Sequence, residues 1–383
     1  MPQSFTSRRF ALQAIAAAAL APALARAGDE ILVGQVNSQS GTNGAELGVG
    51  LRRGVEACFA MVNASGGVHG RRLRLISEDD AYDPAETVRR TAAMLAASNP
   101  VALIGYRGTA TTTALVKSGL LQEYGVTLVG TLTGASELQG APGVLHLRSS
   151  YELELTQLVA QLGRMTFQRI GLLYVNDAFG QVGRDAVVRA AQRQGLTLSA
   201  VATYDKAPDK VAGSLASAVD RLAASPAQCV IAVAVGDPFY TFVSVMRTKS
   251  PSIQLFGMSV VDPKEVVRRC GLAMAAGVGF NQVFPSPFSE RTGLSRAHHE
   301  AMSKLPGSPP SSYFSMEGYV YARVLVEALR SADGFTAPRV TAALEHLAPI
   351  DLGGMAIKVD PVTRNGAHFT DLCVLDGHGR LLA

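Results

Sequence analysis

Short runs of β-branched and other apolar residues alternate along most of this chain with longer segments in which apolar residues recur every three to four positions. The short runs are typical of buried strands, and the longer segments are typical of helices with one apolar face. Strands that alternate with helices in this way favour parallel sheets covered by helices. The first series predicts strands at 31–36, 72–77, 101–105, 126–130 and 144–147, with helices at 45–63, 84–97 and 111–124.

A second series with the same alternation follows the first. It resembles the first series in pattern only, and no sequence repeat relates the two. The 383 residues, of which 48% are hydrophobic, are enough for two cores of ordinary domain size. We therefore predict an α/β protein with two doubly wound parallel sheets. The second series predicts helices at 152–164, 180–194, 210–223 and 238–249, with strands at 169–175, 197–203, 229–235 and 253–257.

The first 27 residues have the pattern of a signal peptide. Arg8 and Arg9 precede an apolar run at 14–24, and the small residues Ala25 and Ala27 follow it. The run is shorter than the roughly 20 residues that span a membrane, so we expect cleavage after Ala27 and export to the periplasm. The arginine pair resembles a twin-arginine export motif, and export by the Sec route stays open.

The charge of the chain gives no sign of a nucleic-acid or membrane-surface partner. The formal net charge is +4, and Arg8, Arg9 and Arg26 carry three of these charges, so loss of the signal segment leaves +1 (4 − 3). A basic stripe with interleaved aromatic residues, the usual mark of such partners, is missing from the sequence. The first cysteine is Cys58, so the cleavage site offers no cysteine for a lipid anchor, and we expect no membrane insertion of the mature chain.

The sequence lacks the motifs of enzymes and metal sites. The glycine-rich segment 48–54 is the nearest approach to a dinucleotide-binding string, but it falls inside an expected helix, which favours helix packing instead. Asp79 and Asp80 are neighbours at a strand end, where side chains face opposite ways, so a turn role is favoured over a catalytic pair. The four cysteines lack the short spacings of a zinc site, and Cys229 and Cys373 are expected to be buried strand residues. We predict no enzyme activity, no metal and no cofactor.

Five segments of the chain carry recognisable strings. They are 31–35 with the polar loop 38–41, Val-Asn-Ala-Ser-Gly-Gly-Val-His-Gly-Arg at 62–71, 78–84, 105–111 and Glu-Gly-Tyr-Val-Tyr-Ala-Arg at 317–323. With these strings the chain resembles the type I periplasmic solute-binding proteins of the branched-chain amino-acid (Leu/Ile/Val) ABC transporter family. The resemblance covers nearly all of the chain after the signal segment, and the string at 62–71 is highly specific.

The resemblance implies two α/β lobes joined by a hinge with three crossovers, which we expect near Ser149, Phe280 and Leu352. Lobe one then comprises 28–149 and 280–352, and lobe two comprises 150–279 and 353–383. The resemblance also implies a monomer, a small-molecule carboxylate ligand and an ABC importer permease as partner. The expected function is capture of an amino acid or a related small carboxylate in the cleft between the lobes. A periplasmic ligand sensor of the same fold stays open as an alternative.

In lobe one the resemblance places ligand-binding residues on two loops that follow strands, where helix N-termini present amides to an anion. The family often has a hydroxyl residue at the place of the glycine that ends the second loop, and in this chain a threonine stands one place earlier. The first loop holds Gly108, Thr109 and Ala110, and the second holds Leu132, Thr133 and Gly134.

Two of these assignments have simpler alternatives. Thr109 and Thr111 are also suited to capping the helix that follows the first loop, and capping uses the same amides as anion binding. Arg107 either assists the ligand or is a solvated loop arginine.

In lobe two the resemblance places ligand contacts at Phe179, Asp237 and Ser259, with Tyr151 at the first crossover. Amino-acid binders of the family often have an acidic residue at the position of Ser259 and an aromatic residue at that of Asp237, so this chain has the two types exchanged. Asp237 is then either a partner for a ligand ammonium group or a cap for the helix that begins at Pro238. Tyr151 either closes over the ligand or packs in the hinge.

Overall fold

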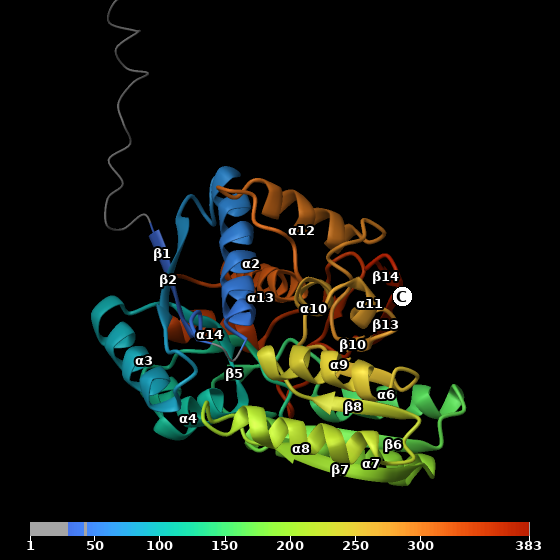
Figure 1. Cartoon of the computed structure of the whole chain (residues 1–383). Coiled ribbons are helices and arrows are strands. Elements are labelled where there is room, and N and C mark those ends of the chain that lie inside the picture. Colours follow the sequence, from blue (N-terminus) through green and yellow to red (C-terminus); the bar gives the residue numbers. More distant parts are fainter. Residues whose placement is uncertain (1–29, 42–43, 383) are drawn as a thin grey trace, which may run out of the picture. The chain divides into compact units, whose positions relative to one another are not determined.

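The computed structural model describes residues 30–41 and 44–382 of the chain (Figure 1). The predicted signal segment 1–27 lies outside these residues, so its cleavage stays a prediction. The α/β class is confirmed, because strands and helices alternate and most strand pairs are parallel. None of the helices in the described ranges has the length and apolar character needed to cross a membrane.

The first part of the chain builds a five-stranded sheet in the order β2-β1-β3-β4-β5. The pairs β1–β3, β3–β4 and β4–β5 are parallel, with Val33 beside Ala102 and Leu128 beside Val144. The strands are β1 (Glu30–Asn37), β2 (Arg72–Asp79), β3 (Ala102–Arg107), β4 (Leu128–Leu132) and β5 (Val144–Leu145). The helices between them are α2 (Ala45–Ala64), α3 (Pro84–Ser98), α4 (Thr109–Ser118), α5 (Leu120–Glu123) and the 3-10 turn η1 (Ser136–Leu138).

The second part builds a seven-stranded sheet in the order β14-β13-β10-β9-β8-β6-β7. Its strands from β6 to β10 pair in parallel, and β13 and β14 add an antiparallel edge from the end of the chain. The strands are β6 (Arg169–Val175), β7 (Thr197–Tyr204), β8 (Cys229–Val233), β9 (Gln254–Met258), β10 (Gly279–Gln282), β13 (Asp371–Leu375) and β14 (Leu381–Leu382). The helices are α6 (Tyr151–Arg164), α7 (Ala178–Gln194), α8 (Val211–Ala223), α9 (Asp237–Lys249), α10 (Pro263–Cys270) and α11 (Leu272–Ala275).

The segment between β10 and β13 returns to the first sheet. Helices α12 (Gly293–Ser303) and α13 (Tyr313–Ser331) pack on α2, and α14 (Ala337–Glu345) contacts β3. A small hairpin of β11 (Ile350–Asp351) and β12 (Ala356–Ile357) follows before the chain enters β13. The chain therefore passes three times between the two sheets, which fits the predicted number of crossovers. The expected crossover at Phe280 falls inside β10, and the exact limits of the lobes stay a prediction.

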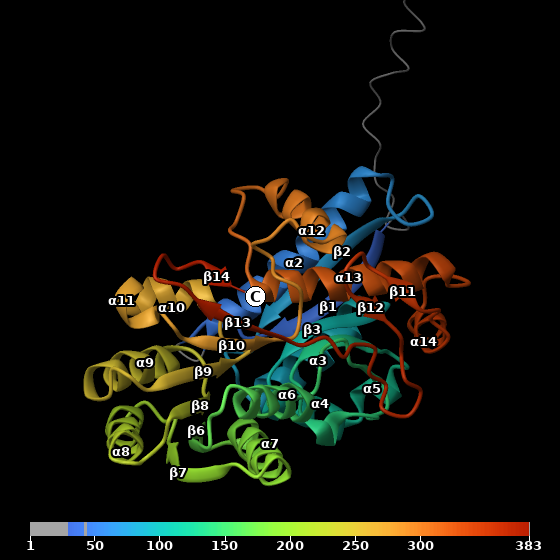
Figure 2. The same cartoon turned by 90° about the vertical axis from the view of Figure 1, so that its right-hand side faces the viewer.

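Both sheets are covered on two faces. Figure 2 shows α2 and α13 on one face of the first sheet and α3 and α4 on the other, and it shows the second sheet between α6 and α7 on one side and α8 and α9 on the other. Strands β3 and β8 are consequently buried at every position, which explains their continuous apolar runs in the sequence. Cys229 and Cys373 are buried strand residues as predicted, and the four cysteines, all at described positions, are free thiols.

The glycine-rich segment 48–54 lies inside α2, where it serves helix packing as predicted. A Cβ on Gly54 would lie 2.0 Å from the carbonyl oxygen of Ser315 in α13, and a Cβ on Gly318 would lie 2.1 Å from that of Leu51 in α2. Only glycine permits the two helix backbones to approach this closely. The close packing of α2 on α13 thus explains the glycines of this segment, and no nucleotide-binding role is needed to explain them.

The structure corrects one predicted helix. The segment 111–124 is not continuous, because Gly119 has a φ of +78° and separates α4 from α5. A residue in the left-handed region ends an α-helix, and glycine adopts that region without a steric cost.

Candidate functional site

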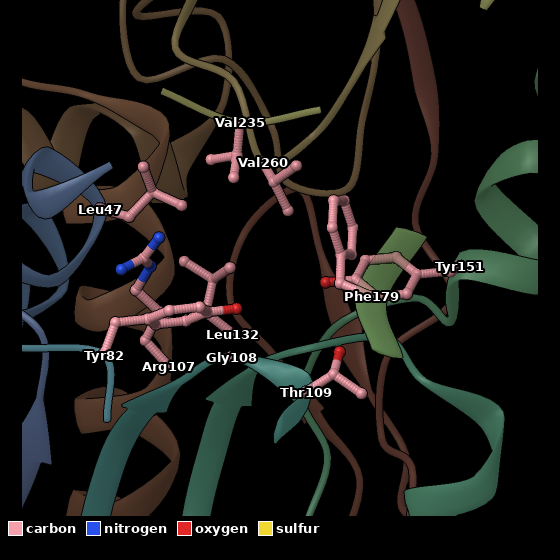
Figure 3. A pocket seen from close by; sticks show the side chains of 10 residues that line it. All are labelled: Leu47, Tyr82, Arg107, Gly108, Thr109, Leu132, Tyr151, Phe179, Val235 and Val260. Atoms are coloured by element: carbon pink, nitrogen blue, oxygen red, sulfur yellow. The ribbon is translucent and has the colours of Figure 1, made fainter. Parts of the chain in front are cut away.

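A cavity lies at the carboxyl ends of the parallel strands, where loops from both sheets meet. Its volume is about 270 Å³, including the part open to solvent. In Figure 3, Val235 and Val260, which follow strands of the second sheet, face residues at the carboxyl ends of β3 and β4, and two aromatic rings close one side. In open α/β sheets ligands bind at this end of the strands. The lining residues are Leu47, Tyr82, Arg107, Gly108, Thr109, Leu132, Tyr151, Phe179, Val235 and Val260.

The turn from β3 into α4 forms one wall of the cavity. Gly108 has a φ of +101° and is the N-cap of α4, and a Cβ at this position would lie 2.4 Å from the Tyr82 ring. The capping role considered for Thr109 and Thr111 is wrong, because α4 has no side-chain cap and the Thr111 hydroxyl donates to the carbonyls of Arg107 and Gly108 instead. The first amides of α4 therefore have no hydroxyl acceptor from a cap residue, and the helix N-terminus favours a negative charge.

Thr109 is buried, and its hydroxyl lies 2.8 Å from that of Thr133. Either oxygen of this pair is able to donate, so the pair leaves Thr109 with a hydrogen-bonding capacity toward the cavity that it lines. Thr133 does not line the cavity, and its hydrogen bond holds the Thr109 hydroxyl in place. One turn along α4, Thr112 makes the same kind of bond with Thr131, at 2.9 Å, away from the cavity lining.

Arg107, the last residue of β3, brings a positive charge to the cavity. It is only 3% exposed, so the alternative of a solvated loop arginine is wrong. Its guanidinium donates to the Ser38 hydroxyl and lies over the Tyr82 ring at 4.5 Å from the centroid. Burial lowers the pKa of Arg107, and the raising effects of Tyr82, Glu46 and Asp80 do not fully offset it.

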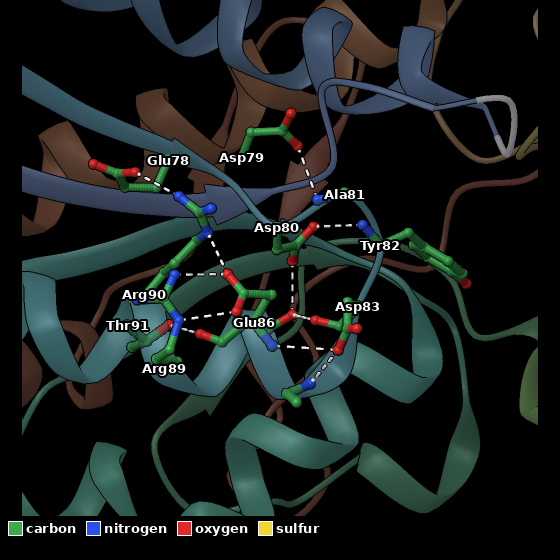
Figure 4. A network of polar contacts seen from close by, with 12 residues as sticks. Glu78, Asp79, Asp80, Ala81, Tyr82, Asp83, Glu86, Arg89, Arg90 and Thr91 are labelled. Carbon is green, nitrogen blue, oxygen red and sulfur yellow. Dashed lines mark hydrogen bonds and ion pairs between the residues drawn. The ribbon is translucent and has the colours of Figure 1, made fainter.

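The loop that carries Tyr82 is held by Asp79 and Asp80, which have the turn role predicted for them (Figure 4). The Asp79 carboxylate accepts from the Ala81 amide at 2.9 Å, and the Asp80 carboxylate accepts from the Tyr82 amide at 2.9 Å and from the Thr87 hydroxyl at 2.7 Å. Ala81 and Tyr82 have φ values of +49° and +65°, which are unfavourable for side chains other than glycine. These carboxylates therefore stabilise a strained turn that directs the Tyr82 ring into the cavity.

Two aromatic residues close the other side of the cavity. Tyr151 at the start of α6 and Phe179 in the first turn of α7 pack edge to face, with ring centroids 5.3 Å apart. Burial raises the pKa of Tyr151, so its phenol stays protonated at neutral pH. Tyr151 thus lines the cavity and packs at the first crossover at the same time, and the two alternatives considered for it are compatible.

The structure brings five of the predicted ligand residues to the cavity lining and leaves five outside it. Ala110 and Thr133 are next to lining residues, and the carbonyl of Gly134 accepts from the Tyr151 amide at 2.7 Å. The sequence reasoning did not assign four lining residues, although two of them follow a predicted strand and a third ends one, which is a usable signal. The lining residues that were predicted are Gly108, Thr109, Leu132, Tyr151 and Phe179, and those that were not assigned are Leu47, Tyr82, Val235 and Val260.

Asp237 and Ser259 do not line the cavity. Asp237 follows Gly236, which is the N-cap of α9 without any side-chain cap, so the helix-capping alternative for Asp237 is wrong. Its side chain is 47% exposed and forms an ion pair with Arg269. Ser259 is buried and donates from its amide and its hydroxyl to the Glu154 carboxylate, at 2.7 and 2.8 Å. Their roles as ligand contacts stay predictions that this geometry does not favour.

Ser259 belongs to a buried polar group that we call the Arg148 network, formed by Arg148, Glu154, Ser259, Glu317 and Tyr321. Arg148 donates to Ser259 and to Glu317, the latter at 3.1 Å, and lies 4.0 Å from Glu154. Burial raises the pKa of Glu154 to about 7, although Arg148 and Ser259 oppose this effect. The network links α13, which packs beside the first sheet, to α6 and the end of β9 in the second.

The chemistry that the cavity offers is binding. Among the described lining residues there is one cation, three hydroxyl groups and otherwise apolar or glycine positions, and none is acidic. A nucleophile beside a general base, which covalent catalysis requires, is not found among these ten residues. No cluster of three or more metal-ligating side chains occurs in residues 30–41 and 44–382.

Comparison with known proteins identifies relatives over nearly the whole chain. The sequence profile of a family described as periplasmic binding protein matches residues 30–374. A Leu/Ile/Val-binding protein homologue of Brucella abortus is 24% identical over 373 residues, covering 92% of this chain and 91% of the relative. A substrate-binding periplasmic protein from Ralstonia solanacearum is 32% identical in its crystal structure, with a TM-score of 0.86, covering 92% of this chain and 99% of that one.

A branched-chain amino-acid ABC transporter protein from Thermus thermophilus with bound valine shares the fold. It is 17% identical with a TM-score of 0.78, and the match covers 92% of this chain and 94% of that chain. Together these similarities confirm the fold that the sequence strings predicted.

Proposed function

We propose that this chain, which belongs to the periplasmic binding protein family, is the solute-binding component of an ABC importer and captures an amino acid or a related small carboxylate. The family implies a periplasmic location, and its members are solute-binding proteins, so the predicted lack of enzyme activity is confirmed. The proposed partner is the importer's permease. Export with cleavage of the signal segment after Ala27 is part of the proposal.

The observation that carries this proposal is the composition of the cavity. Residues at the carboxyl ends of β3 and β4 in the first sheet and residues after β8 and β9 of the second sheet line the same space. A solute that fills this space contacts both parts of the protein, so its binding energy stabilises one arrangement of the two relative to others. A permease that recognises this arrangement then distinguishes loaded from empty protein.

The carboxylate part of the proposal rests on three features of one wall. Arg107 supplies a buried positive charge, the N-terminus of α4 supplies amides, and Thr109 supplies a hydroxyl. Charge-assisted hydrogen bonds to a carboxylate are about twice as strong as neutral ones. The relatives named for leucine, isoleucine and valine are consistent with a small solute that carries this group.

The test is a thermal-shift screen of the protein purified from the periplasm, followed by uptake measurements in cells that lack it. A carboxylate solute at a hundred times its Kd is expected to stabilise the folded protein by about 2.7 kcal/mol. Deletion of the protein is then expected to abolish uptake of that radiolabelled solute. Tight binding with unchanged uptake would refute the importer role and favour the sensor alternative.

A further inference from the structure

The Arg148 network occupies the place where the chain first passes from one sheet to the other. Arg148 lies between β5 and α6, next to the crossover expected near Ser149. Its guanidinium donates to Glu317 of α13, which packs beside the first sheet, and to Ser259, which follows β9 of the second sheet. One side chain therefore ties the two parts of the protein together at their connection.

Each end of this tie is anchored by further hydrogen bonds. On the side of the first sheet, the Tyr321 hydroxyl contacts the Glu317 carboxylate and lies 3.2 Å from the carbonyl oxygen of Thr131 in β4. On the side of the second sheet, the Glu154 carboxylate of α6 accepts from the amide and the hydroxyl of Ser259, at 2.7 and 2.8 Å. A movement of the sheets that separates these two anchors breaks the bonds of the guanidinium between them.

The network contains one carboxyl group more than it has cations. The side chain of Arg148 is 0% exposed, and those of Glu154 and Glu317 are 0% and 2% exposed. With both glutamates ionised, the group carries a net charge of −1 (1 − 2) out of contact with water, which is unfavourable. With one proton bound, the group is neutral, and the same burial costs much less free energy.

The elements that pack against α6 leave this imbalance in place. Helix α7 packs on α6, but its Arg189 and Arg193 pair with Glu152 instead of Glu154. From β10, Asn281 donates to the backbone carbonyl of Glu154 at 2.6 Å and brings no charge. The charged or titratable side chains that act on the Glu154 carboxyl group are Arg148, Glu317 and Tyr151.

Burial favours the protonated form of this carboxyl group. It raises the pKa of Glu154 to about 7 against the attraction of Arg148, and it raises the pKa of Glu317 as well. The contact between Glu154 and the Ser259 hydroxyl suits both forms, because the hydroxyl donates to a carboxylate and accepts from a carboxylic acid. Entry of water on separation of the anchors removes the effect of burial and lowers the proton affinity. The arrangement with the higher proton affinity is therefore favoured as the pH falls.

We propose that the Arg148 network is a proton-dependent clamp, which holds the two sheets in one arrangement while its glutamates share a proton and releases them when that proton is lost. This goes beyond the proposed function, because the clamp acts without any solute. A solute that stabilises the same arrangement is coupled to it, so its binding is accompanied by uptake of a proton, and a higher pH weakens it.

The test is small-angle X-ray scattering of the dialysed protein without added solute, between about pH 5.5 and pH 8.5, on either side of the pKa of Glu154. The radius of gyration of the wild type is expected to rise with pH by about 1 Å, from the roughly 20 Å of a compact chain of this length. Glu154→Gln is expected to keep the low-pH value throughout, because its amide is neutral at every pH and still accepts from the Ser259 amide.

Glu317→Gln tests the charge balance from the other side of Arg148. With one carboxyl group left, the network is neutral without a proton, so the rise with pH is expected to disappear in this variant too. A structural role of either glutamate alone does not predict that both substitutions abolish the same pH dependence. Circular dichroism at each pH value checks that the variants are folded, and either variant that folds suffices for the test.

Asp262→Asn is the matched control. Burial also raises the pKa of Asp262, to about 6, but this residue caps α10 and is not part of the network. Asparagine is an equally good cap, so this variant is expected to follow the wild type. A wild-type radius that does not change with pH overturns the clamp, and so does a change that persists in a folded Glu154→Gln or Glu317→Gln protein or disappears in Asp262→Asn. Each of these results leaves the importer role intact, because uptake and solute binding are measured separately.

Discussion

Two buried arginines in this protein occupy opposite electrostatic environments. Arg148 lies between the carboxylates of Glu317 and Glu154, and its pKa is raised even though burial lowers it. Arg107 donates to the Ser38 hydroxyl and lies over the Tyr82 ring, and burial lowers its pKa although Glu46 and Asp80 act to raise it. Two buried carboxylates thus flank Arg148, whereas Arg107 lies in the lining of the cavity.

The difference indicates which arginine serves stability and which serves binding. Removing one member of a closed ion network leaves the others buried and unpaired, which is costly. Removing Arg107 breaks a hydrogen bond and a ring contact but leaves no carboxylate of the Arg148 network unpaired, and under the proposed function it also deprives the solute of a cation. Binding sites commonly keep groups whose burial is unfavourable at the expense of stability.

The largest expected effect is the loss of Arg148. Arg148→Met is expected to lower the free energy of unfolding by about 3–5 kcal/mol, because Glu317 and Glu154 lose their common cation. Arg107→Met is expected to lower it less, by about 1–3 kcal/mol, because it removes the hydrogen bond to Ser38 and the contact with the Tyr82 ring. Urea unfolding of both variants without added solute measures these values. Equal destabilisation by the two substitutions would contradict the comparison and make Arg107 a structural residue.

The next largest effect is a change of folding stability with pH, which arises from Glu154 in the Arg148 network. The pKa of Glu154 is about 7 in the folded protein because of burial, against 4.5 for an unperturbed glutamate. Between pH 4.5 and about 7, Glu154 keeps its proton in the folded protein but has lost it in the unfolded chain. The stability of the folded protein therefore increases as the pH falls from about 7 toward 4.5. The contribution is at most about 3 kcal/mol.

The variant Glu154→Gln isolates this contribution from that of other groups. Asp262 also has a raised pKa, to about 6, and acts in the same direction, whereas His298 has a pKa lowered by burial to about 4 and acts in the opposite one. The difference between the unfolding curves of the wild type and Glu154→Gln, measured at several pH values, removes both. A difference that does not vary with pH would show that Glu154 does not titrate in this range.

Sequence reasoning predicted the fold more completely than the site, for a physical reason. Strand and helix periodicity is local, so the main elements up to residue 257 were placed, whereas the helices and strands after it were not assigned. The break at Gly119 was missed because glycine inside a helical pattern does not reveal its φ. Gly108, Thr109 and Leu132 were found because they follow strands, and the ends of parallel strands meet at one edge. Tyr82 and Val260 also follow strands, but the polar string around Tyr82 was assigned a turn role, and the segment around Val260 carries no recognisable string.

The sequence was least informative where a side chain's partner lies far along the chain. Ser259 looked available for a ligand, yet its hydroxyl is bound to Glu154, 105 positions earlier. Asp237 looked like a cap or an ammonium partner, and its actual partner, Arg269, is 32 positions away. Which polar groups are already satisfied depends on tertiary packing, and no local pattern contains that information.

A smaller effect is expected when two threonines of α4, each hydrogen-bonded to a threonine outside the helix, are compared. Thr109→Val is expected to weaken binding of the carboxylate by about 1–3 kcal/mol, because a buried ligand oxygen loses a donor, and to lower stability by about 1 kcal/mol. Thr112→Val breaks the equivalent bond to Thr131 away from the cavity, so it is expected to lower stability alone. Calorimetry and urea unfolding on both variants separate the two quantities. Equal affinity losses would show that the helix, not the Thr109 hydroxyl, is the relevant feature.

The smallest effect is expected at Asp237, and it tests whether this residue contacts a bound solute. Asp237→Asn removes an ion pair in which both side chains are more than a third exposed, and such pairs contribute about 0–1 kcal/mol to stability. The helix keeps Gly236 as its N-cap, so no cap is lost. Calorimetry with a carboxylate solute found by the thermal-shift screen is therefore expected to give an unchanged Kd if that solute has no ammonium group. If the preferred solute is instead an amino acid, and its affinity falls by about 2–5 kcal/mol in this variant, then Asp237 reaches the ammonium group in the bound state. The cavity would then supply both charges itself, and the contrast between the two buried arginines would no longer separate binding from stability.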